Sequence, residues 1–414
     1  MERQTSLISP VLIAGCLVLM TGFLIRASFG VFQIPIAEEF GWARTEFSLA
    51  IAIQSLAWGV GQPIFAAIAE KFGDRLAIVL GAITYAIGLI LSAYATTPGQ
   101  HYVLEVLVGF GVAGTGFGVI LAIIGRTASD ENRSLALGIG TAAGSTGQVF
   151  GPPLAAGLLT IMPWSSVFLI FAAMILATLF LLPFMRSPQP VSKEALEESL
   201  SGILGKAFRD PTYTFIFLGF FSCGFQLGFI TAHFPAFVEE MCGPIAPGSI
   251  LDNVGISNTS ILGAVAIGVI GLANIAGAIG AGYLGKMFTK KYLLAYVYLG
   301  RTIAATVFFL LPITPASVLL FSVVMGFLWL ATVPLTSGLV AYIYGLRYMG
   351  TLYGIIFFSH QVGGFLGVYL GGALYDLYGN YNVVWWVGVG VGAFSAIVHL
   401  PVREKPLTER AQAA

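Results

Sequence analysis

Charged residues are scarce in this sequence: Lys, Arg, Asp and Glu together make up 9% of the 414 residues, whereas hydrophobic residues make up 57%. Soluble domains carry about 25% charged residues, so the composition excludes a soluble protein and predicts one that is integral to a membrane. Cysteine is also rare, and two of the three residues, Cys16 and Cys223, lie in apolar segments. A disulfide framework and a metal site are therefore not expected.

Other absences narrow the chemistry further. The sequence has no phosphate-binding glycine loop of the GxxxxGK(S/T) type, so we expect no ATP-driven mechanism within this chain. No Asp and no Lys falls inside the membrane spans predicted below. An enzyme working at membrane depth would need metal ligands there, or a nucleophile with its base. We therefore expect no enzymatic activity and no cofactor, and nothing indicates a nucleic acid as a partner.

Long apolar segments fill the chain instead, and its mean hydropathy is +0.91. A membrane-spanning helix needs about 20 mostly apolar residues. We predict an all-α membrane protein with twelve transmembrane helices, at residues 10–34, 46–69, 77–95, 102–124, 134–160, 165–185, 212–238, 259–285, 292–313, 316–341, 350–375 and 383–400. Because the number is even, both ends of the chain are expected on the same side of the membrane.

The positive charges separate cleanly when these spans are threaded through a bilayer. Sixteen of the 19 Lys and Arg residues fall on the side of the two ends: Arg3, Lys71, Arg75, Arg126, Arg133, Arg186, Lys193, Lys206, Arg209, Lys286, Lys290, Lys291, Arg347, Arg403, Lys405 and Arg410. Only Arg44 falls on the other side, while Arg26 and Arg301 lie inside spans. The positive-inside rule then places both ends in the cytoplasm of a multi-pass protein of the bacterial inner membrane.

The two halves of the chain resemble each other. Residues 66–75 align with residues 282–291 at an offset of 216, and the same offset places Gly138, Gly147 and Gly151 on Gly354, Gly363 and Gly367. Parallel repeats of this kind are the plan of one large class of transporters. We predict an N-terminal six-helix half at 1–185, a cytoplasmic linker at 186–211 and a C-terminal six-helix half at 212–414.

The loop between the second and third spans carries a motif. Its residues Ala66, Glu70, Lys71, Gly73 and Arg75 resemble the loop signature of the major facilitator superfamily, in which Gly and Asp stand where this chain has Ala66 and Glu70. The resemblance covers the whole chain. It implies a gate clasp, in which Glu70 pairs with the cations across a helix end and favours one facing state. The alternative is an ordinary cytoplasmic loop whose charges only fix the orientation.

Within that superfamily, several segments look like those of bacterial relatives of monocarboxylate porters and oxalate–formate exchangers. They are residues 29–32, 40–44, 58–63, 333–338 and 358–361. Those porters usually carry an Arg late in the eighth span that holds the carboxylate. This chain has Ala278 at that position and Asn274 four residues earlier, so the resemblance does not supply the carboxylate-binding residue.

Charged and titratable residues inside spans are functional candidates because a charge in the bilayer core is costly. Arg26, in the first span, could bind an anionic substrate or could be structural. Arg301, in the ninth, is expected to have a structural or gating role. Glu105, near the outer end of the fourth, could accept a coupling proton or could be an interfacial acid. His233 and His360 titrate near neutral pH and could carry a proton or only pack, with His360 beside Gln361 the stronger candidate.

Uncharged polar and aromatic residues complete the predicted substrate site. The amides of Gln54, Gln148, Gln226 and Asn274 are expected to turn inward, because amides in lipid need partners. Trp58 and Trp329 could stack on a planar substrate or could simply pack between helices.

These observations predict a secondary active transporter that moves a small organic solute by alternating access. Uptake of an organic anion such as a monocarboxylate, with a coupling proton as a further partner, is the first hypothesis. Import of a planar nutrient or vitamin such as riboflavin is the alternative, and export of drugs or metabolites is weaker. The protein is expected to work as a monomer in the lipid bilayer.

Overall fold

The computed structural model describes residues 7–42, 44–185, 199–407 and 409, and it is helical throughout these segments apart from short connections. Its elements are α1 (Pro10–Phe40), α2 (Arg44–Phe72), α3 (Asp74–Ser92), α4 (Pro98–Thr115), α5 (Phe117–Thr127), α6 (Arg133–Leu159), α7 (Trp164–Ala177), η1 (Thr178–Phe184), α9 (Leu200–Arg209), α10 (Pro211–Met241), α11 (Ile250–Asn253), α12 (Thr259–Met287), α13 (Lys290–Leu310), α14 (Pro315–Leu328), α15 (Thr332–Tyr344), α16 (Met349–Tyr378) and α17 (Asn382–Val398).

Each of the twelve predicted spans coincides with one helix or with two helices in series. Ten spans in the described residues are long and apolar enough to cross a membrane by length and composition alone. The other two are α6, which is rich in Gly, Ser and Thr, and α17, which has 17 residues. Both pack against helices that pass this criterion, α6 on α1 and α17 on α13. The prediction of an all-helical membrane protein is therefore confirmed.

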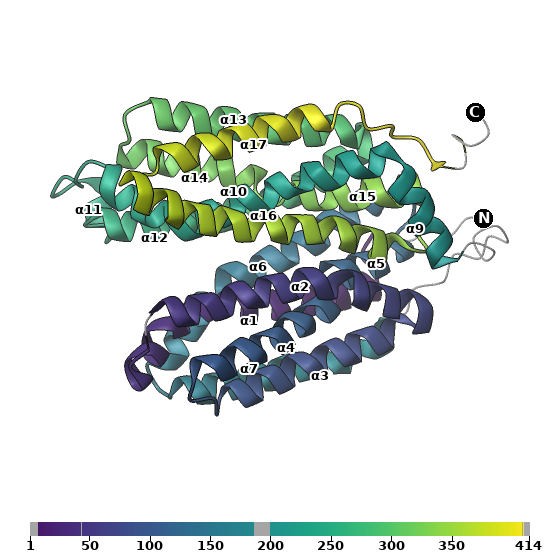
Figure 1. Cartoon of the computed structure of the whole chain (residues 1–414), viewed down its shortest axis with the longest axis horizontal. Helices are drawn as coiled ribbons and strands as arrows, with labels where there is room; N and C mark the ends of the chain where they lie inside the picture. The colour runs from purple at the N-terminus through teal and green to yellow at the C-terminus, as the bar shows by residue number, and fades with distance from the viewer. Residues whose placement is uncertain (1–6, 43, 186–198, 408, 410–414) are drawn as a thin grey trace.

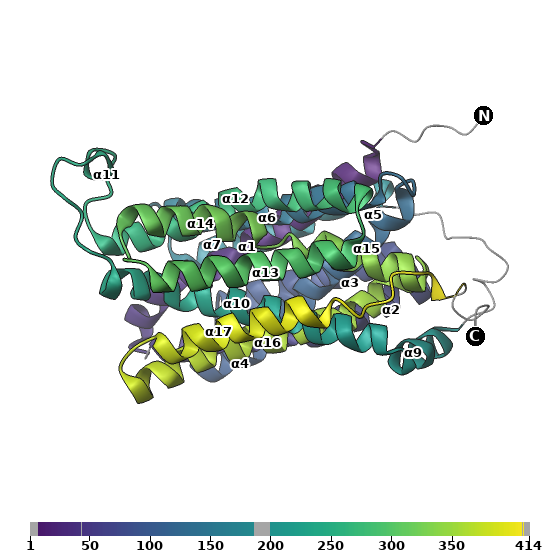
Figure 2. The ribbon, with the colours of Figure 1, turned by 90° about the horizontal axis from the view of Figure 1, so that it is seen from above.

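Two bundles lie side by side, and both ends of the chain lie at the same end of the molecule (Figures 1 and 2). One bundle contains α1 to η1 and the other contains α10 to α17. Large apolar side chains on α3 and α13 point outward: Leu80, Ile83, Ile87, Leu299, Ile303 and Leu310 are all exposed. Soluble proteins rarely expose apolar patches of this size, because apolar surface in water is unfavourable; these faces are therefore suited to contact with lipid.

Four helices begin with the same local signal, a capping residue followed by proline. Ser9-Pro10, Thr97-Pro98, Asp210-Pro211 and Thr314-Pro315 each place a side-chain oxygen on a free backbone N–H and a proline where no N–H is needed. The pairs recur at offsets of 201 and 217 residues between the two bundles. The internal repeat is therefore visible at the N-termini of these helices as well as in the loops.

The predicted glycine repeat has a packing reason. A Cβ on Gly147 or Gly151 of α6 would lie 2.1 Å from a backbone oxygen of α1, and on Gly363 or Gly367 of α16 it would lie 2.1 or 2.2 Å from one of α10. Only glycine permits backbones to approach so closely. The equivalent helices of the two halves thus pack in the same way.

The fourth span of each half is broken at its middle. Gly116, with extended backbone, separates α4 from α5, and residues 329–331 separate α14 from α15. The sequence runs through both places without a proline, so the predicted spans at 102–124 and 316–341 were continuous. Unwound backbone at membrane depth leaves N–H and C=O groups that other side chains must satisfy.

The two halves meet along two helix pairs, α2 with α16 and α6 with α12. Gly354 of α16 lies against Pro63 of α2, and Gly138 of α6 lies against Gly282 of α12. Residues 138 and 354 are equivalent in the repeat, so the two seams are related by the same pseudo-symmetry. In Figure 1 the bundles lie closest at the end where the chain termini lie.

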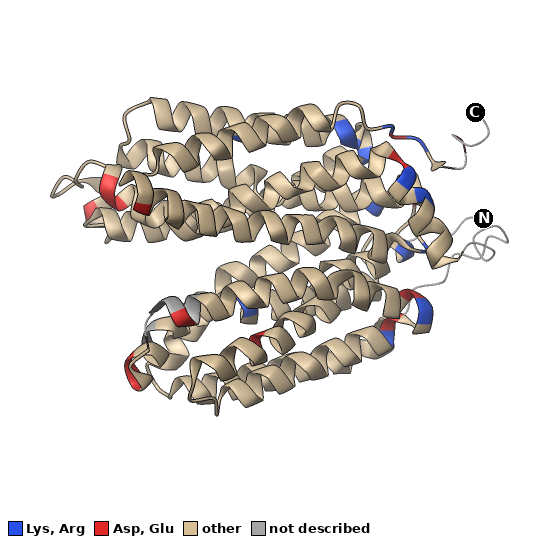
Figure 3. Cartoon of the chain, viewed as in Figure 1, with Lys and Arg blue, Asp and Glu red and all other residues tan. Residues whose placement is uncertain are grey.

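The positively charged residues are distributed along the molecule as the sequence predicts. In Figure 3 most of the Lys and Arg residues lie at the end that carries both termini. Arg3, Arg186, Lys193 and Arg410 lie outside the described residues. So does the first half of the predicted linker, residues 186–198. Its second half contains α9, whose Ile203 and Ala207 are buried.

Candidate functional site

Arg26 lies in the middle of α1, between the two halves. Its Nη2 donates a hydrogen bond of 3.1 Å to Ser55 Oγ on α2, and its Cζ lies 4.7 Å from the centre of the Trp58 ring. Its Nε is buried without a hydrogen-bond partner, and in the part of the chain described here no carboxylate is bonded to it. One turn farther along the same helix face, Gly30 is exposed.

Trp58 belongs to an aromatic wall built from both halves. Its ring lies 5.5 Å from Phe23 of α1 and 4.7 Å from Phe357 of α16. Its Nε1 donates a 2.7 Å hydrogen bond to Gln62, one turn away on α2. His360 continues the wall, stacked on Phe357 with ring centres 5.2 Å apart.

Gln361 joins the halves at this wall. Its Nε2 donates a 3.0 Å hydrogen bond to the Ser55 backbone oxygen, and its Oε1 lies 3.1 Å from His360 Nδ1. A Cβ on Gly59 would lie 2.8 Å from Gln361 Cβ, so only glycine fits there. Arg26, Trp58, His360 and Gln361, four of the predicted site residues, are thus brought together around Ser55.

Asn274 occupies the equivalent place on the other seam. Its Nδ2 donates to Ser145 Oγ of α6 at 2.8 Å, and its Oδ1 accepts from the Leu330 backbone N–H at 2.9 Å. It therefore connects the first half to the break between α14 and α15, where Trp329 also lies. Asn274 therefore bridges the halves, with both its amide nitrogen and its amide oxygen bonded within the protein.

Arg301 supports the same break. Its Nε and Nη2 donate to the Leu328 carbonyl at 3.0 and 2.6 Å, and Nη2 also contacts the Trp329 carbonyl. Its side chain is fully buried on α13. These bonds pair carbonyl groups at the helix break, and Arg301 Nη1 is buried without a hydrogen-bond partner.

Five predicted residues lie elsewhere. Gln226 donates to the Gly388 carbonyl of α17 at 3.1 Å, and the His233 ring lies 2.9 Å from the Val368 carbonyl of α16. Both contacts lie within the second half and do not reach Arg26. Gln148 is half-buried on α6, and Glu105 is bonded to Gln54 inside the first half.

Glu70, the acidic residue of the expected gate clasp, has a different bonding partner from the one predicted. Glu70 accepts a 3.0 Å hydrogen bond from the Thr351 backbone N–H and another from its hydroxyl. Lys71 instead lies over the Phe72 ring, and Arg75 donates to the Pro183 carbonyl. The pairing of Glu70 with its neighbouring cations was therefore wrong. A carboxylate at the free N–H groups that begin α16 is a favourable arrangement because a helix N-terminus carries partial positive charge.

A second contact closes the other seam at the same end. Lys286, the repeat equivalent of Glu70, lies 2.7 Å from Glu131 and 3.3 Å from Asn132, just before α6 begins. Lys286 lowers the pKa of the Glu131 carboxyl, first by its hydrogen bond and then by its charge. In each half, a residue at the end of the second span thus contacts the start of the fifth span of the other half. Glu70 of α2 contacts the start of α16, and Lys286 of α12 contacts the segment that precedes α6.

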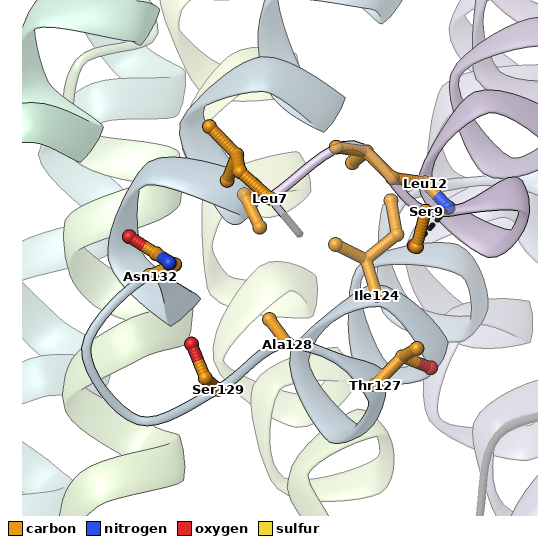
Figure 4. Close-up of a pocket in the computed structure, with 9 residues that line it drawn as sticks. Leu7, Ser9, Leu12, Ile124, Thr127, Ala128, Ser129 and Asn132 are labelled. Atoms are coloured by element: carbon orange, nitrogen blue, oxygen red, sulfur yellow. Dashed lines mark hydrogen bonds between the residues drawn. The ribbon is translucent and has the colours of Figure 1, made fainter. Parts of the chain in front are cut away.

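A small pocket lies at this end of the molecule, apart from Arg26. It has a volume of about 90 Å³ and lies between the start of α1, the end of α5 and the start of α6. Figure 4 shows Ser9, Thr127, Ser129 and Asn132 around it, together with apolar side chains. Within the described residues, no group of three or more His, Cys, Asp or Glu is placed to hold a metal ion.

Some residues of the site could not be found in the sequence. Ser55 and Phe357 are an ordinary serine and phenylalanine in apolar segments, and Thr351 lies 281 residues from Glu70. The one signal for Ser55 is its place between Gln54 and Trp58, both of which were predicted. His101 and His399 were not selected either, and both are buried.

The sequence profile of the Major Facilitator Superfamily matches residues 12–368. The chain belongs to the Major Facilitator Superfamily. Proteins of this superfamily are transporters, so the expectation that the chain is not an enzyme is confirmed.

Known superfamily members resemble this chain over most of their length. The uncharacterized MFS-type transporter YcxA of Bacillus subtilis is 26% identical over 91% of this chain and 90% of its own. Monocarboxylate transporter 13 of Rattus norvegicus is 26% identical over 90% of this chain and 82% of its own. Among solved structures, FucP, the E. coli fucose:proton symporter, in the outward conformation is 15% identical, with a TM-score of 0.72 over 95% of this chain and 99% of that one. This last likeness shows that the fold is shared.

Proposed function

We propose that this Major Facilitator Superfamily transporter takes up a small organic anion of the monocarboxylate class, with Arg26 as the group that binds the carboxylate. The observation that carries the proposal is the bonding of Arg26. Its guanidinium contacts a neutral hydroxyl and a tryptophan ring, and its buried Nε has no acceptor. An arginine at membrane depth needs an anionic or strongly polar partner, and its rigid donor fork suits a carboxylate.

The other mid-span arginine of the described residues, Arg301, has different partners, although its Nη1 is also buried without a hydrogen-bond partner. Arg301 is bonded to the carbonyls of the helix break, and α12 has Ala278 and Asn274 where the monocarboxylate porters usually have their cation. Ala278 lies instead against Gly138. Arg26 can therefore do from α1 what an arginine of the eighth span does in those porters. The similarity to monocarboxylate transporter 13 supports this substrate class.

Transport requires that the site opens to one side at a time. Contacts between the halves extend from Glu70 and Lys286, at the end with the termini, to Ser55 and Asn274 at the middle. Gly30, one turn from Arg26 toward the opposite end, is exposed. We propose that both termini lie in the cytoplasm of the bacterial inner membrane, so that this structure is closed to the cytoplasm. The halves 1–185 and 212–414 then move against each other around Arg26.

The proposal can be tested by uptake of radiolabelled L-lactate, pyruvate and L-galactonate into proteoliposomes. Loss of one or two charge-assisted hydrogen bonds, at about 1.5–3 kcal/mol each, should weaken binding at least about tenfold in Arg26→Gln. Arg26→Lys keeps the charge and should retain part of the uptake, and Arg209→Gln, on exposed α9, is the matched control. Unchanged uptake by Arg26→Gln would refute the role of Arg26.

A planar nutrient is the second candidate, because Trp58, Phe357 and His360 form a continuous wall of rings beside Arg26. Such a wall favours stacking on an aromatic ligand. A thermal-shift comparison separates the two: a ligand at 100 times its Kd adds about 2.7 kcal/mol to stability. Stabilisation by riboflavin that persists in Arg26→Gln, with none by the carboxylates, would replace the anion proposal.

A further inference from the structure

A cysteine thiol lies inside the second half, beside the break between α14 and α15. Cys223 of α10 is fully buried. Its Sγ lies 3.2 Å from Thr332 Oγ1 and 4.0 Å from the Trp329 carbonyl oxygen. The thiol also interacts with the His360 ring and with the Arg301 guanidinium. Polar groups from α13, α15 and α16 therefore face this one thiol.

Hydrogen bonds fix the position of the proton on His360. Gln361 Nε2 donates to the Ser55 backbone oxygen, so the amide oxygen of Gln361 is the atom that faces His360 Nδ1. Because an amide oxygen can only accept, Nδ1 carries the proton of the neutral ring and Nε2 carries the lone pair. Among the described residues, this buried Nε2 has no hydrogen-bond partner. An unused base therefore lies on the ring that interacts with Cys223.

A cation is the second group that acts on the thiol. Arg301 is fully buried, and its Nη1 has no hydrogen-bond partner in the described part of the chain. The nucleophilic form of cysteine is the thiolate, which a neighbouring base and a neighbouring cation both favour. Cys16 offers a comparison: it is half-buried, and its Sγ lies 4.0 Å from the Ile139 carbonyl oxygen. Cys223 thus has the surroundings of a reactive cysteine, although it is the more buried of the two.

Aromatic rings surround His360, which contacts the seam through Gln361 and also interacts with Cys223. The centres of the Phe220 and Phe357 rings lie 5.1 and 5.2 Å from the centre of the His360 ring. A charged reagent would lose its hydration among these rings at a high cost in free energy, whereas a small uncharged reagent would not. The surroundings of the thiol therefore select uncharged compounds.

We propose that Cys223 is a modification site for small uncharged electrophiles that carry an activated C=C bond, with His360 as its base. The Sγ atom attacks the β carbon, and a C–S bond forms as the π bond of the C=C group breaks. The thiol proton passes to His360 Nε2 and from there to the α carbon. The product is a thioether, and the addition needs no oxidant and releases no leaving group. This modification goes beyond the proposed function and does not depend on the transported solute.

The adduct should stop the transport cycle. It adds atoms to a sulfur that already lies 3.2 Å from Thr332 Oγ1, and a close-packed interior accepts extra atoms only if its neighbours move. The neighbours are the break between α14 and α15 and the His360–Gln361 pair, whose amide joins the halves at Ser55. We therefore expect transport to fall in proportion to the fraction of Cys223 that is modified.

The first experiment measures rates of labelling by N-ethylmaleimide on the purified full chain, by mass spectrometry of each cysteine. Cys223 should react faster than Cys16. His360→Phe keeps a ring against Phe357 but removes the base. It should slow labelling of Cys223 by about 100-fold, the lower end of the effect of a positioned general base, and should leave Cys16 unchanged. A maleimide that carries a sulfonate group should label Cys223 more slowly than N-ethylmaleimide does.

A second variant keeps the imidazole and changes only its proton. Gln361→Leu removes the acceptor that holds the proton on Nδ1, so labelling of Cys223 should slow while labelling of Cys16 does not. Slower labelling of Cys223 than of Cys16 in the wild type would overturn the proposal. So would a ratio of the two rates that neither His360→Phe nor Gln361→Leu changes.

The second experiment measures uptake of L-lactate and pyruvate into proteoliposomes before and after treatment with N-ethylmaleimide. The wild type and Cys16→Ser should lose uptake in step with the labelling of Cys223, and Cys223→Ser should keep it. Inhibition that persists in Cys223→Ser would refute the effect of this thiol on transport. If the untreated wild type takes up neither anion, the proposed function fails, whereas the labelling rates still decide the modification site.

Discussion

Removal of the Glu70 carboxylate should shift the balance between the two facing states. In this structure the carboxylate accepts two hydrogen bonds from Thr351 at the start of α16, and in the opposite state it would be in water. Hydrogen bonds to a charged group contribute about 1.5–3 kcal/mol each, net of water. We expect Glu70→Ala to destabilise the state closed at the terminal end by about 3–6 kcal/mol, or about 140- to 20,000-fold. Glu70→Gln keeps an acceptor and should have a smaller effect.

Two single cysteines, in a background without the three native ones, can report this balance. Gly30→Cys lies on the face of Arg26 and has nothing within 4 Å of the added Cβ, so it is accessible in this structure. Ser134→Cys is buried at the α6–α12 seam. Glu70→Ala should slow labelling of the first and speed labelling of the second by a membrane-impermeant maleimide.

Lys71→Ala is the matched control, because Lys71 neighbours Glu70 but lies over Phe72 away from the seam. Labelling rates that do not change in Glu70→Ala, or that change equally in Lys71→Ala, would refute the clasp.

Three further predictions follow from the same contacts. Arg301→Met should lower thermal stability in detergent by about 1–3 kcal/mol for each carbonyl of the helix break left unbonded; an unchanged Tm would contradict this. Lys286 holds the pKa of Glu131 below its ordinary value of about 4.5, so their bond stabilises the closed end above that pH and is lost as pH falls through the lowered pKa. Acid slows the maleimide reaction equally in both backgrounds because it protonates the thiol; the labelling rate of Ser134→Cys with Lys286 present, divided by its rate in Lys286→Ala at the same pH, should therefore rise in acid. Gly138→Val places atoms against the Ala278 carbonyl, 2.7 Å from the Cβ, and should prevent closure; fast uptake by this variant would exclude that role.

The helices of this protein could be predicted because each crossing needs a long apolar segment. The positive charges between these segments predict on which side of the membrane each loop lies. The repeat could be predicted as well, since close packing demands glycine at equivalent places such as Gly147 and Gly363. The break near Trp329 could not, because tertiary contacts support it: Arg301 and Asn274 bond to the backbone there from other helices.

The candidate site was predicted in part. Arg26 and His360 stand out because charge and titratable groups are rare at membrane depth. Gln226 was selected because an amide at membrane depth needs a partner, yet its amide bonds to α17. Residue type cannot tell which face of a helix meets which neighbour. Glu70 was selected by the loop motif, but Thr351 was not, because a backbone N–H has no signal in the sequence.

The two seams of this pseudo-symmetric molecule are fastened by different chemistry. At the end of the α2–α16 seam a mostly enclosed carboxylate, Glu70, bonds to a helix start, whereas the α6–α12 seam ends in a pair of which Glu131 is 76% and Lys286 28% exposed. An exposed ion pair contributes only about 0–1 kcal/mol, because water weakens the attraction and two long side chains lose conformational freedom. We therefore expect the α6–α12 seam to separate first, so that the halves turn about a line close to α2–α16 and not about the centre of the molecule. Paired spin labels across each seam would show this order, and simultaneous separation would contradict it. The axis of motion would then be decided by two side chains at equivalent positions and not by the symmetry of the fold.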